Sequence, residues 1–199
     1  MKTIRAGFAA AALALAAVLP VAAETGDPDW PCVQRKTGPM SAAVLWPGPL
    51  PEVPVAGAAA DLAAALALRR VSLEEAAARV AGFAGANRPD AATLGAIFRD
   101  AFERIDRDRT RLIGGISRYA HAQAALAARI DLAHAEFARI EAGKQPDFDR
   151  LDALEDQIDW DERIYRDRER SLTYVCETPV LLEKRAYAVA QMLKEYLPE

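Results

Sequence analysis

The fold is decided by one stretch of 53 residues, 90–142, with the sequence DAATLGAIFRDAFERIDRDRTRLIGGISRYAHAQAALAARIDLAHAEFARIEA. Its apolar side chains recur mostly at steps of three, four and seven, which is the pattern of a long amphipathic helix with a coiled-coil-like seam. The seam comprises Leu94, Phe98, Ala101, Ile105, Leu112, Ile116, Tyr119, Leu126, Ile130, Phe137 and Ile140. A straight helix of this length would measure about 80 Å, whereas a compact domain of this size has a radius of gyration of about 16 Å. We therefore expect the helix to project as a stalk or to bend, with Gly114-Gly115 as the site of the bend or of a close helix contact.

A second long helix should follow directly. Residues 143–146, Gly-Lys-Gln-Pro, predict a turn, and an apolar stripe then predicts a helix from about 148 to 176. Pro179 should interrupt this helix, and a last helix is expected over 180–196. Because a short connection between long helices implies antiparallel neighbours, the sequence predicts an all-α fold built on a helical hairpin.

Shorter elements precede the hairpin. One helix is expected over about 58–70, and a second should begin at Ser72, which forms a capping-box pattern with Glu75. These helices should pack at the open end of the hairpin, so that 58–199 forms a single helical domain. Residues 24–57 hold seven of the twelve prolines and predict an extended strap over the helices, or else an arm that orders on binding a partner. The expected anchors of this strap are Trp30, Cys32, Val44, Leu45 and Trp46.

The first 23 residues have the three-part composition of a cleavable export signal. Lys2 and Arg5 give a positive start, 6–19 is apolar, and Val21-Ala22-Ala23 offers small residues for cleavage. The apolar run of about 14 residues is too short to span a hydrocarbon core of about 30 Å. We expect cleavage after Ala23 and a periplasmic or secreted mature protein without stable membrane insertion; an uncleaved anchor is the alternative.

Cys32 and Cys176 are the only cysteines. In an oxidising compartment an even count predicts a disulfide, so we expect these two to be linked. Two free thiols or a reactive redox pair are the alternatives, and the absence of a CxxC motif disfavours the second. With the turn centred near Pro146, Cys176 should lie opposite residue 116, beside the glycine pair.

The charge balance limits the partners. Loss of Lys2 and Arg5 with the signal changes the formal net charge from −4 to −6. Nucleic-acid affinity comes largely from basic residues that meet phosphates, so we expect no nucleic-acid partner. The same balance disfavours anionic lipid surfaces.

An arginine-rich motif occurs twice. Residues 103–111 and 162–170 share the form E-R-I-x-R-D-R-x-R, and either an old duplication or chance could produce this echo. Spacings of three and four place three arginines on one face of each copy. Two interpretations are open. Each face is either a solvated surface with ion pairs, or a candidate interaction face that binds an acidic partner or a small anion. Their members are Arg104, Arg107, Arg111, Arg163, Arg166 and Arg170.

A run of eight acidic residues follows the turn, within 147–162. The helix dipole explains acids in the first turn but not eight of them. A calcium loop is disfavoured because Leu151 occupies a ligand position and the glycine is missing. We expect a docking face for a basic protein, formed by Asp152, Glu155, Asp156 and Asp159.

No pattern in the chain carries catalysis or a cofactor. His121 and His134 are the only histidines and lie about 220° apart around one helix, so they cannot share a metal without a partner helix. The haem-attachment motif and the serine-nucleophile motifs are absent. We expect no metal, no cofactor and no catalytic residue.

These observations favour an exported interaction or accessory protein without its own catalytic activity. The Ala- and Arg-rich composition suggests a bacterium, and hence the bacterial periplasm with another envelope protein as partner. A long apolar seam also allows a homo-oligomer. A helical bundle that binds a small ligand, a metal or haem is the first alternative, and an enzyme of unrecognised type is the second.

The export signal makes a direct prediction. The full chain expressed in a secreting bacterium should yield a released protein whose N-terminal sequence begins at Glu24, because the small residues before it suit signal peptidase. N-terminal sequencing and intact mass check this. A membrane-bound product that still begins at Met1 would instead establish the uncleaved anchor.

Overall fold

The computed structural model describes residues 29–198. The expected signal at 1–23 and the start of the strap at 24–28 lie outside these residues. The described chain contains helices and no strand, which confirms the all-α fold. The helices are α1 (Ala42–Leu45), α2 (Gly57–Ala67), α3 (Leu73–Asn87), α4 (Ala91–Glu141) and α5 (Phe148–Lys194).

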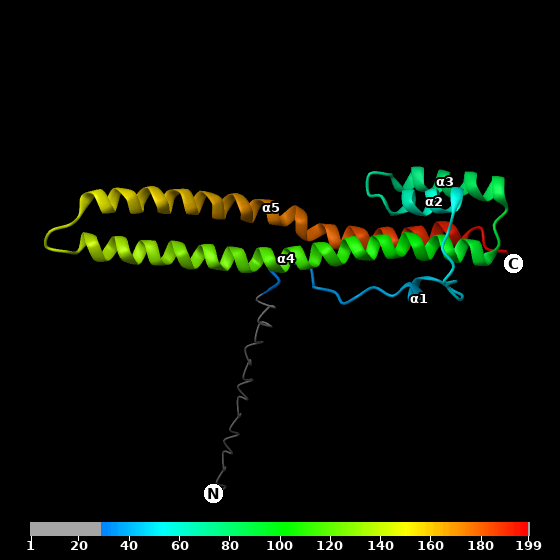
Figure 1. Ribbon diagram of the computed structural model, residues 1–199, viewed down its shortest axis with the longest axis horizontal. Coiled ribbons are helices and arrows are strands. Elements are labelled where there is room, and N and C mark those ends of the chain that lie inside the picture. The colour runs from blue at the N-terminus through cyan, green and yellow to red at the C-terminus, as the bar shows by residue number, and fades with distance from the viewer. Residues whose placement is uncertain (1–28, 199) are drawn as a thin grey trace, which may run out of the picture.

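Helices α4 and α5 form the predicted antiparallel hairpin, and they extend far beyond the rest of the molecule (Figure 1). Asp90 caps α4 by accepting a hydrogen bond from the Thr93 N–H, and Asp147 caps α5 by accepting one from the Arg150 N–H. Such caps satisfy backbone donors that have no partner within the helix. The caps therefore fix where each long helix begins, α4 at the end of the hairpin opposite the turn and α5 directly after the turn.

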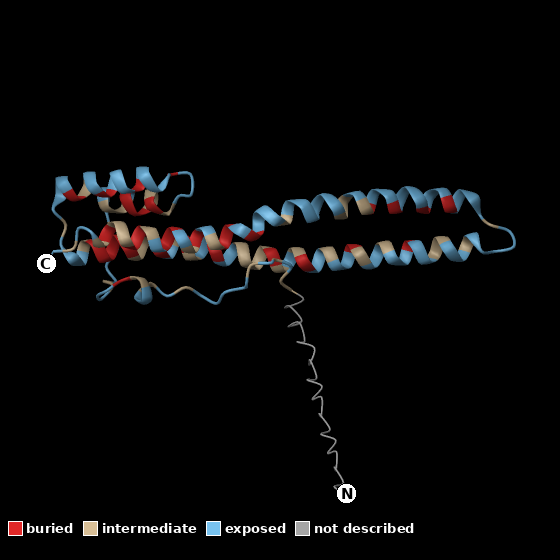
Figure 2. Ribbon diagram, turned by 180° about the vertical axis from the view of Figure 1, so that it is seen from behind, coloured by how far each residue is buried: buried red, intermediate tan, exposed pale blue. Residues whose placement is uncertain are grey.

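Two expected breaks in the hairpin are absent. α4 continues through Gly114-Gly115 without bending, and a Cβ atom at either glycine would meet only the side chain of Arg118 on the same helix. The expectation of a bend or a close helix contact was therefore wrong. α5 also continues through Pro179, so the two helices expected at 148–176 and 180–196 are one. Proline removes one hydrogen bond to the preceding turn, and α5 slopes toward α4 near this level in Figures 1 and 2 instead of ending.

The main core lies at one end of the hairpin, where α2 and α3 pack on it; we call this end the base (Figure 2). Phe98 of α4 is fully buried and stacks on Trp46 of the strap, with ring centroids 5.0 Å apart. Gly95 lets the strap approach closely, because a Cβ there would lie 3.2 Å from Pro51 and 3.3 Å from the Trp46 indole nitrogen. The base thus joins four helices and the strap around one apolar centre.

A buried arginine closes the end of α2. Arg185 of α5 donates from Nε to the Leu66 carbonyl at 2.6 Å and from Nη1 to the Val71 carbonyl at 2.8 Å. The last carbonyls of a helix have no partner within it, and a cation nearby also opposes the helix dipole. Burial lowers the pKa of Arg185 from its ordinary value, because the charged guanidinium is withdrawn from water.

The two short base helices differ slightly from their expected bounds. α2 ends at Ala67 rather than near residue 70. α3 begins after Ser72, whose hydroxyl accepts a hydrogen bond from the Glu75 N–H as the capping pattern predicts. The chain then leaves α3 through Arg88, which adopts the left-handed conformation with φ of 44°.

The strap lies along the hairpin from the level of Cys32 to the base (Figure 1). Trp46 is buried, and Leu45 packs against the main core. Val44 is 82% exposed, so its expected role as an anchor was wrong. It lies in the single turn of α1, which turns Leu45 and Trp46 toward the core. Met40, Leu50 and Val55 pack against the core as well and were missed.

Beyond the base, the hairpin continues as two helices, and the start of the described strap lies against only the near part of them; we call 116–141 and 148–175 the arm. A small second core lies here, with Ala133, Leu154 and Ile158 buried and Phe137 and Ile140 packed against them. The buried carboxylate of Asp161 accepts two hydrogen bonds from Arg129 across the helices. These bonds raise the pKa of Arg129.

No helix within residues 29–198 combines the length and the apolar character that crossing a membrane requires.

The base should dominate stability. Replacement of Phe98 by alanine should lower the free energy of unfolding by about 3–5 kcal/mol, because it opens a cavity in the core. The matched change Phe148→Ala should alter it by less than about 0.5 kcal/mol, since Phe148 is 70% exposed. Urea unfolding followed by circular dichroism checks both, and equal losses would contradict the placement of the core.

Candidate functional site

The strap is covalently joined to the hairpin. Cys32 and Cys176 form the predicted disulfide, with their Cα atoms 5.5 Å apart. Ile116 and Val175 line one hollow between α4 and α5, so the expected register of the hairpin at this level is confirmed. In the chain-entropy model, closing a loop of about 145 residues stabilises the fold by about 5 kcal/mol, an upper figure.

A second attachment of the strap is ionic. Arg109 of α4 is only 2% exposed and donates from Nε to Glu183 of α5 at 2.8 Å. Its Nη2 donates to the carbonyls of Thr37 and Gly38 and to the Thr37 hydroxyl, which in turn donates to Glu183. One guanidinium therefore joins α4, α5 and the strap. Sequence reasoning missed it, because Arg109 sits in the echo motif between arginines that share another face.

The arginine faces are mostly engaged within their own helices. Arg104 pairs with Asp100, Arg107 with Glu103, Arg111 with Asp108, Arg166 with Glu162, and Arg170 with Asp167. Arg163 is exposed and has no ion pair within the described chain. The two copies of the echo also differ in environment, because Arg168, which corresponds to the buried Arg109, is exposed. Helix-surface pairs of this kind are worth only a few tenths of a kcal/mol.

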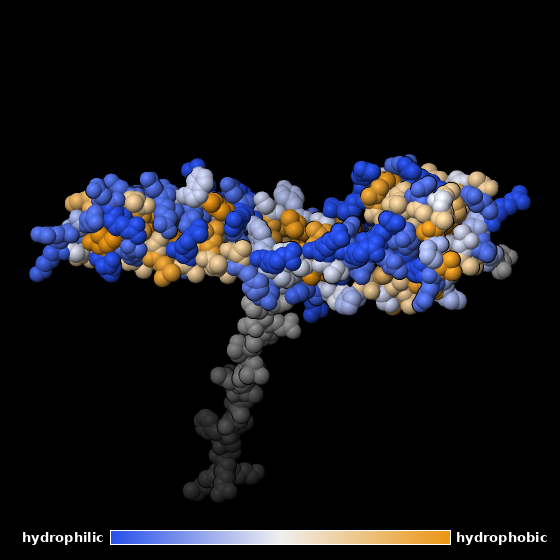
Figure 3. Space-filling view, viewed as in Figure 1, coloured by the Kyte–Doolittle hydropathy of each residue, from blue (hydrophilic) through white to orange (hydrophobic). Residues whose placement is uncertain are grey.

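The acidic face differs from the arginine faces. Asp152, Glu155, Asp156 and Asp159 all lie exposed on α5, and none of them forms an ion pair with another residue of 29–198. Trp160, which directly follows Asp159, is 63% exposed. The space-filling view of one side of the arm shows mostly hydrophilic surface with isolated apolar patches (Figure 3). Asp161, by contrast, is buried and belongs to the core of the arm.

The histidines lie apart, as expected from their spacing. His121 contacts Asp29 at 3.2 Å, and His134 contacts Glu162 at 3.4 Å, both on exposed surface. Among residues 29–198, no three histidine, cysteine or carboxylate side chains come together as metal ligands would.

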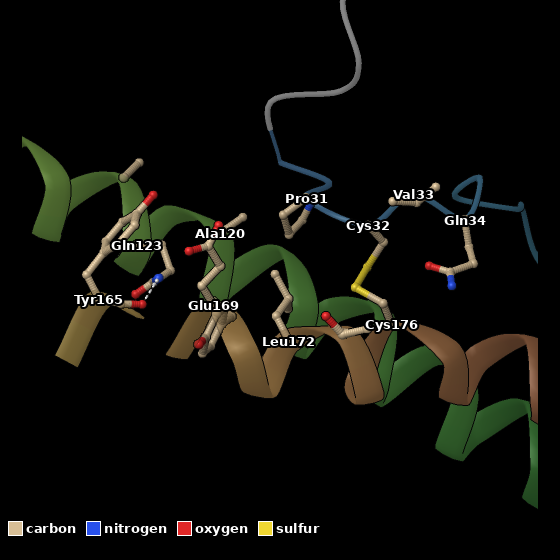
Figure 4. Close-up of a pocket in the computed structure, with 13 residues that line it drawn as sticks. Pro31, Cys32, Val33, Gln34, Ala120, Gln123, Tyr165, Glu169, Leu172 and Cys176 are labelled. Atoms are coloured by element: carbon tan, nitrogen blue, oxygen red, sulfur yellow. Dashed lines mark hydrogen bonds between the residues drawn. A yellow bond between two sulfur atoms is a disulfide. The ribbon is translucent and has the colours of Figure 1, made fainter. Parts of the chain in front are cut away.

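A groove lies between the strap and the arm beside the disulfide (Figure 4). Its volume is about 460 Å³. Residues 31–34 of the strap form one wall, and α4 and α5 form the others. Its polar lining includes Gln123, Tyr165 and Glu169, and its apolar lining includes Ala120, Leu172 and the disulfide itself. No sequence pattern could predict this groove, because its walls come from three distant segments.

Two polar atoms in the groove walls are buried without a protein partner, the hydroxyl of Tyr119 and the side-chain oxygen of Gln123. The Gln123 side-chain nitrogen donates to the Tyr165 carbonyl at 3.3 Å, which leaves its oxygen as a free acceptor. Burial raises the pKa of Tyr119, and the nearby charge of Arg168 partly opposes this. Tyr119 also lines a smaller apolar hollow of about 230 Å³, together with Gly115 and Leu172.

Comparisons with known proteins found no match to a family model, to a curated protein or to a solved structure.

The buried guanidinium of Arg109, which joins the strap to both long helices, can be tested with a matched pair of variants. Arg109→Met should lower the free energy of unfolding by about 2–3 kcal/mol, because hydrogen bonds to charged groups are lost inside the protein. Arg168→Met, the same change at the corresponding echo position, should cost less than about 0.5 kcal/mol. Urea unfolding of both variants measures this. Equal effects would mean that Arg109 does not hold the strap.

Proposed function

We propose that the protein is an exported interaction protein of the bacterial periplasm, without catalytic activity, that binds a basic partner protein along the arm of its hairpin. The observation that carries this proposal is the acidic face of α5, four exposed carboxylates that form no ion pair with another residue of 29–198. Unneutralised charge of one sign attracts and orients a partner of the opposite sign.

The arm is suited to docking because it is only two helices thick. The helices α2 and α3 pack at the base and the strap reaches only the near part of the arm, so the far part of the arm is left uncovered by the described chain. An exposed tryptophan next to carboxylates resembles the composition of binding hot spots, in which an aromatic anchor is surrounded by polar groups. Trp160 is therefore the expected anchor, and Asp156 and Asp159 its acidic rim.

The disulfide supports the proposed location in an oxidising compartment outside the cytosol. Bonds of this kind persist in oxidising environments and are rare in the bacterial cytosol. The Cys32–Cys176 link thus agrees with the export signal expected at 1–23. The arginine faces support a docking role less well, since five of their six members already pair within their own helices.

Site-specific photo-crosslinking tests the proposal. A benzophenone amino acid is placed at Ala153, which is exposed and lies at helical spacing from Asp156 and Trp160. On irradiation of whole cells it should form an adduct with a second polypeptide. The triple change Asp152→Lys, Asp156→Lys and Asp159→Lys should reduce this adduct at least tenfold, and so should Trp160→Ala. In extracts the adduct should decrease as salt increases, because exposed charges are screened.

The control keeps the same total charge. Glu52→Lys, Glu74→Lys and Glu195→Lys alter three exposed acids outside the arm and should leave the adduct unchanged. Three outcomes would overturn the proposal: no adduct, an adduct only with a second copy of this chain, or an equal loss in the control. The second of these outcomes would identify the arm as a homo-oligomer interface.

A further inference from the structure

The groove beside the disulfide has the features of a small-molecule site that the proposed docking function does not use. It lies on the side of the hairpin covered by residues 31–34, and none of the four residues of the acidic face lines it. Its volume of about 460 Å³ falls within the usual range for ligand pockets. Its walls combine apolar surface with a few polar groups, as such pockets generally do.

Two polar groups of the groove that lack partners are acceptors, the Gln123 oxygen and the Glu169 carboxylate, and a third, the Tyr119 hydroxyl, can donate or accept. The Gln123 oxygen is buried and accepts no hydrogen bond from the protein, because its amide nitrogen is directed to the Tyr165 carbonyl. The carboxylate of Glu169 extends toward the strap in Figure 4 and has no ion pair within the described chain. A buried acceptor without a donor costs free energy, so a ligand that supplies donors gains by binding here.

The charge of the lining points to a cation. Glu169 is the only charged side chain among the residues that line the groove. Arg168 acts on Tyr119 but does not line the groove. The ring of Tyr165 adds a π surface, which attracts an ammonium or guanidinium group. Carboxylate, amide oxygen and ring together form a recognition site for a positively charged donor.

The rest of the groove is apolar. Pro31, Ala120 and Leu172 contribute hydrocarbon surface, and the disulfide closes one end (Figure 4). We propose that this groove binds a small organic cation, a primary amine on an apolar or aromatic body, with the ammonium group between Glu169 and Gln123. Because the disulfide holds the strap in place before binding, little chain ordering opposes association.

Isothermal titration of the oxidised mature protein with three matched indoles tests this. Tryptamine carries an ammonium group, tryptophol a neutral hydroxyl and indole-3-acetate a carboxylate, on the same apolar body. Tryptamine should bind at least tenfold more tightly than tryptophol, and indole-3-acetate should not bind. Glu169→Gln and Gln123→Leu should each weaken tryptamine binding at least tenfold, with circular dichroism confirming that the helices are retained.

The matched control is Glu177→Gln, the same change two turns further along α5, at an exposed residue that does not line the groove. It should leave tryptamine binding unchanged. Equal weakening by Glu177→Gln and Glu169→Gln would indicate general attraction to an acidic protein and would overturn the proposal. Binding of the three indoles with equal affinity, or no tryptamine binding, would also overturn it and leave a groove filled by water only. The titration needs no partner protein, so its result is independent of the docking proposal.

Discussion

The architecture depends on a mismatch between the length of the hairpin and the amount of chain available to cover it. α4 and α5 contain 51 and 47 residues, whereas α2 and α3 contain 11 and 15. The shorter helices can therefore bury only one end of the hairpin. Since burial of apolar surface is the main favourable contribution to folding, the base holds the larger core and the arm depends on a narrow seam. That seam consists of alanines, a few leucines and isoleucines, and the cross-helix pair of Arg129 with Asp161.

The strap is held by three kinds of interaction at three levels. The disulfide joins it to α5, the guanidinium of Arg109 joins it to both long helices, and Trp46 packs on Phe98 at the base. An irregular segment has backbone groups that no helix or sheet satisfies, and Arg109 supplies donors for two of its carbonyls. The same attachments fix the wall of the groove at residues 31–34. The disulfide is the attachment nearest the groove, so the groove wall depends most directly on the pairing of Cys32 with Cys176.

Much of the fold could be predicted, because the spacing of apolar residues indicates which face of a helix packs along its whole length. The seam from Leu94 to Ile140, the capping residue Ser72 and the pairing of the cysteines were all evident from the sequence. The predictions at Gly114-Gly115 and Pro179 were wrong, because they considered only the local helix propensity of glycine and proline. Two glycines cost a helix about 2 kcal/mol in propensity and a proline about 3 kcal/mol, and tertiary packing on both sides offsets such costs. The packing is seen in the buried side chains nearby. Ile116 directly follows the glycine pair, Thr178 precedes Pro179, and Leu182 lies one turn after it.

Side-chain roles were less predictable than helices. Arg109, Arg168 and Arg185 are chemically alike, and only the tertiary structure determines that the first and third are buried. Val44 and Trp46 are two residues apart in the strap, yet the turn of α1 leaves Val44 exposed and Trp46 buried. The groove could not be predicted, because the strap, α4 and α5 meet there from separate parts of the chain. The acidic face could be recognised in the sequence, because its residues lie on successive turns of one helix.

The central claim is that a long two-helix arm projects from a small base. X-ray scattering on the monomeric mature protein, separated by size-exclusion chromatography in line, tests this most directly. The 51 residues of α4 span about 75 Å at 1.5 Å per residue, so the account predicts a maximum dimension of at least that length. A radius of gyration near about 16 Å, the value of a compact domain of this size, would mean that the arm folds back on the base and would contradict the account.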